Sequence, residues 1–81
     1  MNSAIEYNGH VIEPTTRAKG TPSQWTLEVR IAPVGQDTEA RRCRAPNMYP
    51  TKARAVVNCL EFGRRIVDGK MRPRTTRGNG D

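Results

Sequence analysis

Strict alternation of apolar and polar residues marks one stretch near the middle of the chain. Trp25, Leu27, Val29 and Ile31 alternate there with Gln24, Thr26, Glu28 and Arg30. A period of two with one apolar face is typical of a strand that packs one side on a core and exposes the other. The pattern therefore predicts a strand over residues 24–31 with the Trp25 side facing inward.

The flanking stretches carry weaker strand signals. Asn8-Gly9 between 5–7 and 10–12 predicts a hairpin, since both turn residues tolerate positive φ. Residues 13–23 have no apolar period and contain two prolines, which predicts a loop. Residues 39–45 predict a return strand with Cys43 and Ala45 inward, and the two prolines within 46–50 predict its end.

Apolar residues at spacings of three and four predict one helix over residues 52–68. Thr51 is suited to cap its first turn, and Gly69 to end it in a left-handed conformation. The predicted inward stripe consists of Ala53 or Val56, Cys59, Leu60, Gly63, Ile66 and Val67. A glycine inside this stripe predicts close approach of helix to sheet, with Trp25 as the expected neighbour.

These elements together predict a single α+β domain over residues 1–69. Its expected architecture is a three-stranded or four-stranded antiparallel sheet packed on one face by a single C-terminal helix, in the order β-β-β-α. With 81 residues, 35% of them hydrophobic, the chain has material for one small core. Residues 70–81 hold one apolar side chain and four basic ones, which predicts a disordered basic tail.

The formal charge of +6 is unevenly distributed along the chain. Residues 1–40 carry three basic and five acidic side chains, whereas residues 41–81 carry eleven basic and three acidic ones. Positive charge gathered in one half favours a polyanionic partner, because the summed field steers phosphates toward it. The alternative is a solvated surface that only maintains solubility.

The open face of the predicted sheet is the best candidate for such a partner. Arg30, Arg42 and Arg44 are expected on it, with Glu28 as the only predicted acid. The arginine fork grips phosphates and guanine edges. The predicted face holds no aromatic, which stacking of single-stranded bases normally needs, so contact with a duplex backbone is favoured. The candidate nucleic-acid-binding residues are Arg30, Arg42, Arg44, Lys70, Arg72, Arg74 and Arg77, and the expected partner is duplex DNA or RNA.

Little in the sequence supports catalysis or metal binding. His10 is the only histidine, and Cys43 and Cys59 fit no metal-binding or redox spacing. The two cysteines are expected as buried thiols of a reducing compartment, or alternatively as a redox crosslink. We therefore expect no enzyme, cofactor, metal or small-molecule substrate. The absence of a signal peptide and of a long apolar run predicts a cytoplasmic protein without membrane contact.

A second function class stays open at this point. A protein-interaction module or small homodimer would pair an exposed strand edge, or exposed apolar residues such as Tyr49 and Phe62, and would have no nucleic-acid role. The predicted outer face of the helix does not favour either class, because its charges are nearly balanced and typical of a solvated surface. That face holds Arg54, Asn58, Glu61, Arg65 and Asp68. The spacing of four residues predicts ion pairs between Glu61 and Arg65 and between Arg64 and Asp68.

The chain resembles small uncharacterised proteobacterial proteins. The resemblance is carried by Tyr49-Pro50-Thr51-Lys52 leading into residues 59–69, by Trp25 at the start of a strand, and by a Tyr-x-Gly-x-x-Ile-x-Pro opening at residues 7–14. It covers residues 5–69 and implies a β-β-β-α domain with no assigned activity. Arg54 departs from the glutamate expected there, which would weaken the helix start.

A more distant similarity is to DNA-binding domains built from a three-stranded sheet and one helix, in plant ethylene-response factors and phage integrase arms. These families share the strand order, a tryptophan that opens a strand and a Thr-Lys helix start. Their contacts to DNA come from arginines and tryptophans on the open sheet face. Only Arg30, Arg42 and Arg44 correspond here, because Trp25 is expected to face inward.

Overall fold

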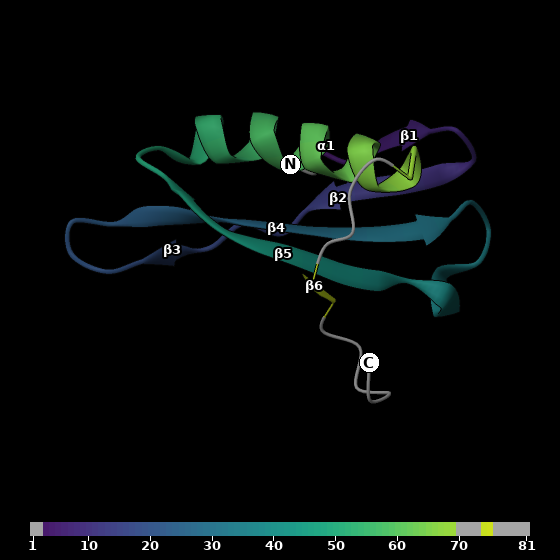
Figure 1. Cartoon of the computed structure of the whole chain (residues 1–81), viewed down its shortest axis with the longest axis horizontal. Coiled ribbons are helices and arrows are strands. Elements are labelled where there is room, and N and C mark those ends of the chain that lie inside the picture. Colours follow the sequence, from purple (N-terminus) through teal and green to yellow (C-terminus); the bar gives the residue numbers. More distant parts are fainter. Residues whose placement is uncertain (1–2, 70–73, 76–81) are drawn as a thin grey trace.

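The computed structural model describes residues 3–69 and 74–75. They form one antiparallel sheet with a single helix across one of its faces (Figure 1). In chain order the elements are β1 (Ile5–Tyr7), β2 (His10–Pro14), β3 (Ala18–Lys19), β4 (Gln24–Pro33), the 3-10 turn η1 (Asp37–Glu39), β5 (Arg41–Tyr49), α1 (Lys52–Val67) and β6 (Arg74–Thr75). The predicted α+β class is confirmed, but the sheet has more than three or four strands.

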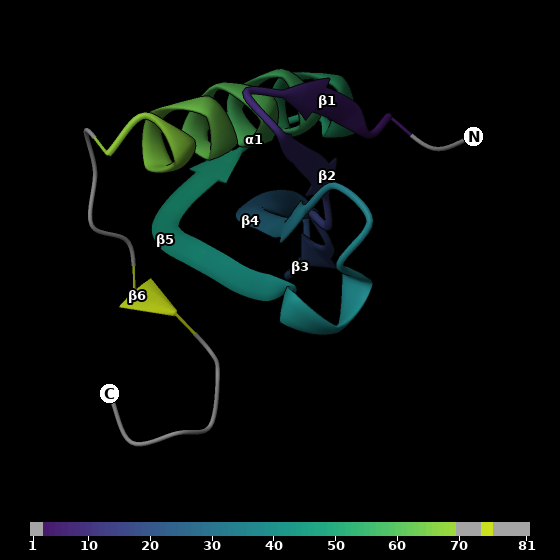
Figure 2. The same cartoon turned by 90° about the vertical axis from the view of Figure 1, so that its right-hand side faces the viewer.

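The strands follow the order β1-β2-β4-β5-β6, and β3 pairs with β4 off this path, giving six strands among the described residues. All pairings are antiparallel. Viewed end-on, α1 lies across one side of the sheet with β1 beside it (Figure 2). Of the predicted disordered tail, residues 70–73 and 76–81 lie outside the described residues, and 74–75 form β6.

The predicted hairpin at Asn8-Gly9 is confirmed. Tyr7 of β1 pairs with His10 of β2, and the two turn residues have φ values of 48° and 78°. These angles match the left-handed conformations that a two-residue hairpin turn requires. The hairpin is long enough for β2 to reach Pro14, two residues beyond its predicted end.

The segment predicted as a loop contains a strand and stays close to β4. Besides the β3 pairing, the Thr15 N–H donates to the Glu28 carbonyl and the Thr26 N–H to the Arg17 carbonyl, each at 3.0 Å. The Arg17 N–H also donates to the Thr26 hydroxyl, and Thr26 is buried, although the alternation predicted it facing solvent. Side-chain periodicity could not show this pairing, because its contacts are mainly backbone hydrogen bonds.

From Leu27 to Ile31 the central strand follows its predicted alternation. Leu27, Val29 and Ile31 are buried and Trp25 is half-buried. The prediction that its partner β5 ends before Pro46 is wrong, because β5 continues to Tyr49. The register shifts so that Leu27 pairs with Ala45 while Thr26 pairs with Met48, which leaves two extra residues on β5. A proline is tolerated in such a bulge, because no ladder hydrogen bond needs its missing donor.

The helix matches its prediction to within one residue. The Thr51 hydroxyl accepts from the Arg54 N–H at 3.2 Å, and Gly69, after the last turn, has a φ of 75°. Its buried residues are Ala55, Cys59, Phe62, Gly63 and Ile66. The predicted stripe was therefore rotated, since Ala53 is exposed and Leu60 and Val67 are only half-buried. No helix of the described residues is long and apolar enough to cross a membrane.

The core lies between α1 and the sheet. It joins Ile12, Leu27, Val29, Ile31 and Cys43 of the sheet with Cys59, Phe62 and Ile66 of the helix. The predicted close approach at Gly63 is confirmed, because a Cβ atom built there would overlap Cγ2 of Ile12. The neighbour is thus Ile12 on β2 and not Trp25. Burial of Phe62 also removes it as an exposed contact for a partner.

Candidate nucleic-acid interface

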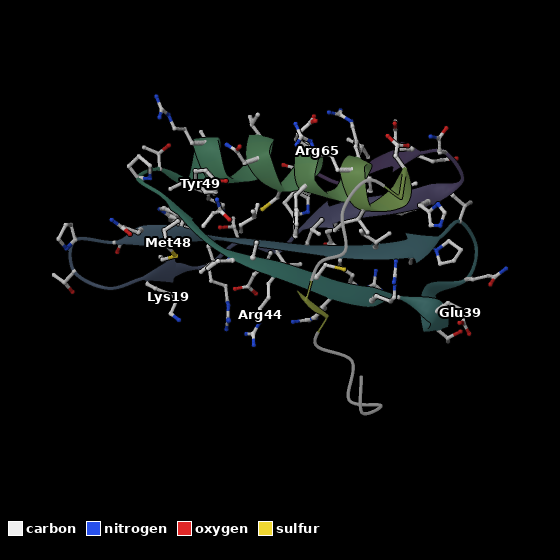
Figure 3. The ribbon with its side chains drawn as sticks, in the orientation of Figure 1. Lys19, Glu39, Arg44, Met48, Tyr49 and Arg65 are labelled. Atoms are coloured by element: carbon white, nitrogen blue, oxygen red, sulfur yellow. The ribbon has the colours of Figure 1, made fainter. Side chains whose placement is uncertain are left out.

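The sheet face turned away from α1, called the open face below, brings three predicted arginines together. Arg30 of β4 and Arg42 of β5 are direct cross-strand partners, and Arg44 follows two residues along the same strand. Residues two apart on a strand share a face, so all three stand on one side. Arg42 and Arg44 are exposed, whereas the Arg30 side chain is 26% exposed. In Figure 3, Arg44 points away from α1.

Among the residues that the structure describes, two acids lie on the open face, whereas one was predicted. Glu28 is the cross-strand partner of Arg44, and Glu13 is the partner of Arg30. Glu13 lies 3.9 Å from the Arg30 guanidinium. The sequence predicted Glu13 in a loop, because residues 13–23 have no apolar period and contain two prolines. The longer β2 brings this carboxylate into the sheet.

Arg17 and Lys19 are basic residues of this region that the sequence pattern did not place on the open face. The Arg17 guanidinium lies 3.4 Å from the Glu28 carboxylate, and its side chain is 67% exposed. Lys19 on β3 points to the same side as Arg44 (Figure 3). Both residues fell in the predicted loop. The signal that could have found them is the absence of any acid over residues 14–27.

The charges of the open face do not cancel. Arg17, Lys19, Arg30, Arg42 and Arg44 lie on or beside it, against Glu13 and Glu28. Both ion pairs are long, and their arginine side chains reach solvent, with Arg17 67% and Arg30 26% exposed, whereas Glu28 and Glu13 are 16% and 35% exposed. A phosphate can therefore reach either guanidinium beside its carboxylate partner.

The candidate residues of the tail are only partly described. Lys70, Arg72 and Arg77 lie outside the described residues. The backbone of Arg74 belongs to β6, which pairs with the outer edge of β5. Its register partner is Arg44, so the chain places a fourth predicted residue next to the open-face arginines.

Aromatic rings of the described residues lie elsewhere. Trp25 and Tyr49 are cross-strand partners near the start of α1, and Nζ of Lys52 lies 5.7 Å from the Trp25 ring centroid. Tyr7 and Tyr49 pack against the core, and Phe62 is inside it. An open face without aromatic rings offers charge and hydrogen bonds to a partner, but no platform on which an unpaired base could stack.

Charged side chains on the outer face of α1 form ion pairs and hydrogen bonds with neighbouring residues. Glu61 accepts from Arg65 at 3.2 Å, as predicted, and also lies 3.5 Å from Arg64. Asp68 was expected opposite Arg64, but its carboxylate instead accepts from the Tyr7 hydroxyl at 2.8 and 3.0 Å. The Tyr7–Asp68 hydrogen bond raises the pKa of this phenol, because the carboxylate favours the protonated hydroxyl. The hydrogen bonds between Tyr7 and Asp68 link β1 to the C-terminal end of α1.

The remaining reactive groups do not gather into a site. Cys43 and Cys59 are free and buried in the core, and burial raises the pKa of both thiols. Nδ1 of His10 lies 3.0 Å from the Asn8 carbonyl oxygen of the same turn. Within residues 3–69 and 74–75, no group of three or more His, Cys, Asp or Glu is placed to hold a metal ion.

No protein-family model, no curated protein and no solved structure matches the chain. The resemblance to proteobacterial β-β-β-α proteins and the distant similarity to sheet-based DNA readers therefore stay predictions.

Proposed function

We propose that this protein is a small, non-enzymatic nucleic-acid-binding or accessory protein that contacts the phosphate backbone of duplex DNA or RNA. The contacts come from Arg30, Arg42 and Arg44 on the open face, supplemented by the basic tail. In this proposal the protein acts in the cytoplasm, where its two buried thiols stay reduced.

One observation carries the proposal, the direct cross-strand pairing of Arg30 with Arg42 beside Arg44. Like charges directly opposite each other repel and destabilise a sheet, and the Glu13 carboxylate, 3.9 Å from the Arg30 guanidinium, offsets part of this repulsion. A bound phosphate relieves that repulsion, since each guanidinium can donate charge-assisted hydrogen bonds to its oxygens. The arrangement thus fits a phosphate-binding role better than a surface selected for stability alone.

The test is the salt dependence of binding to a 16-base-pair duplex. Three neutralised phosphates predict a slope of about −2.7 for log affinity against log salt, from about 0.9 per contact. Replacing Arg30, Arg42 and Arg44 together by glutamine should remove most of this slope. The matched control replaces Arg41, Arg64 and Arg65, which changes the net charge equally but leaves the open face intact.

Absence of duplex binding at about 50 mM salt would overturn the proposal, because screening is weak there. A dimer that forms without duplex and is insensitive to salt would instead favour the protein-interaction module. Such a module would use a strand edge or the exposed apolar side chains of Val34, Met48 and Val57, since Phe62 is buried and Tyr49 packs on the core.

A further inference from the structure

Acidic residues are absent from two long stretches of the sequence. No Asp or Glu occurs over residues 14–27 or over residues 40–60. The fold brings parts of both stretches to one end of the molecule, where the β3–β4 turn and the first turn of α1 lie (Figure 1). The basic residues there are Lys19, Lys52 and Arg54, all exposed, and we call this surface the basic end.

Trp25 joins the two halves of the basic end. It pairs with Ala18 of β3 on one side and with Tyr49 of β5 on the other. From the helix, Lys52 lies over its ring at 5.7 Å. The residues of the basic end are thus held to one framework, although they come from distant parts of the sequence.

Three acids lie away from the basic end, whereas Glu28 and Glu13 lie on the open face beside Arg17 and Arg30. Glu39 of η1 lies at the opposite end from Lys19 in Figure 3, Glu61 lies in the second half of α1, and Asp68 is the residue that caps its C-terminal end. The first turn of α1 contains no acidic side chain. The positive partial charge of the helix start therefore adds to that of the nearby lysines and is not cancelled.

We propose that the basic end is a second phosphate-contacting surface, which extends the nucleic-acid contact beyond the open face. The inference rests on the proposed function for the kind of partner, but it concerns different residues. Lys19 connects the two surfaces, since it points to the same side as Arg44 (Figure 3). A duplex that lies along the open-face arginines would then contact Lys19 first. It would contact Lys52 and Arg54 where its phosphate backbone passes the end of the sheet.

The chain carries its own reporter for this surface. Trp25 is the only tryptophan, and the Lys52 ammonium lies over its ring. A phosphate that draws Lys52 away changes the charge near the indole, so binding at the basic end should shift the tryptophan emission. The open-face arginines lie on the other side of the sheet from this ring, and their occupation alone should leave the emission unchanged.

The experiment titrates a 16-base-pair duplex at several salt concentrations while tryptophan emission is recorded. Replacing Lys19, Lys52 and Arg54 together by glutamine should make the slope of log affinity against log salt less negative by about 2.7. Emission is followed in the wild type and in the open-face triple variant, both of which keep Lys52. The triple variant of Arg41, Arg64 and Arg65 is the matched control and should retain the wild-type slope and emission change.

The two proposals fail in different ways. An unchanged slope in the basic-end variant, or an emission that does not respond to duplex, would overturn the inference while the open-face contact could still hold. Loss of slope in the basic-end variant together with no effect of the open-face variant would support the inference and overturn the open-face site. Binding to phosphatidylserine vesicles without binding to duplex would contradict both.

Discussion

At the level of single residues, packing requires a glycine at position 63, because there is no space for a side chain between the helix and Ile12. Replacing a mid-helix glycine by alanine normally stabilises a helix by about 1 kcal/mol. Here the new Cβ would overlap Ile12, and overpacking of a core costs about 1–3 kcal/mol. We therefore expect Gly63→Ala to lower the free energy of unfolding, measured by urea denaturation.

A double-mutant cycle identifies the cause. Ile12→Ala alone should cost about 2–5 kcal/mol, because Ile12 is fully buried. In the Gly63→Ala background the same change should cost less, since it also removes the overlapping methyl group. Additive effects of the two substitutions would show that the contact with Ile12 is not what excludes alanine.

The two buried thiols predict a fall in stability at alkaline pH. Burial raises the pKa of Cys43 and Cys59 in the folded state, whereas unfolded thiols ionise near their ordinary pKa of about 8.5. Above that pH the unfolded state binds fewer protons than the folded one, so the free energy of unfolding decreases as pH rises toward the folded pKa values. Urea denaturation between pH 7 and 9.5 measures this decrease.

The comparison for this prediction is the double variant Cys43→Ala, Cys59→Ala. It should be less stable at every pH but should lose less of its stability between pH 8.5 and 9.5. The range stops at 9.5 because the Tyr7 phenol, whose pKa is also raised, begins to contribute above it. An equally steep decrease in both proteins would contradict the assignment to the thiols.

Among the elements, the start of α1 links stability to the proposed binding. The Thr51 hydroxyl caps the first turn, and Arg54 occupies the third helical position, where glutamate would complete a capping box. We expect Arg54→Glu to stabilise the helix by about 0.3–1 kcal/mol and at the same time to weaken duplex binding, because it places an acid in the basic end. Thermal denaturation and a duplex titration measure the two effects.

The cap itself supplies the control for that experiment. Thr51→Ala should destabilise the protein by about 1 kcal/mol with little change in the salt slope. Thr51→Ser should leave both the stability and the salt slope close to wild type. If Arg54→Glu changed stability without weakening duplex binding, the basic end would not include Arg54.

The elements also show what the sequence could predict. β4 and α1 have long runs with one apolar face, and the turn residues Asn8, Gly9, Thr51 and Gly69 have specific conformational roles, so their boundaries followed from pattern and turn chemistry. β3 has two exposed residues and no alternation, so only its backbone pairing reveals it. Pro46 falsely indicated a strand end, because local sequence does not show that a bulge will accommodate it.

The same limit applies to the candidate interface. Arg30, Arg42 and Arg44 could be placed on one face because strand alternation fixes the side to which each residue points. Glu13 and Arg17 could not, since their positions depend on how far the chain stays paired with β4 beyond the hairpin. The apolar pattern of the helix did not predict that Phe62 is buried. The buried side of α1 also contains Ala55, and such a small residue contributes little to an apolar pattern.

For the whole molecule, removal of residues 70–81 separates the tail from the folded domain. The deletion removes four basic side chains, so the salt slope should fall by up to about 3.6 if every one of them meets a phosphate. Binding should persist, because the open face remains. NMR chemical shifts of residues 3–69 should stay close to wild type except along the outer edge of β5, where β6 pairs.

A tail in which all four basic residues are replaced by glutamine is the matched comparison, since it keeps the backbone of β6. Its slope should equal that of the deletion. Complete loss of duplex binding in either protein would contradict a role of the open face, because the folded domain would then contribute no contact of its own.

The separation of acids from the basic end also has a kinetic consequence. In a body about 37 Å long, positive charge without acids at one end makes the distribution of charge along the long axis uneven. In the field of a polyanion such a body experiences a torque that turns the β3–β4 turn and the start of α1 forward before contact. Fewer collisions are then wasted in unproductive orientations, so association is fast at low ionic strength and slows steeply as salt shortens the range of the field.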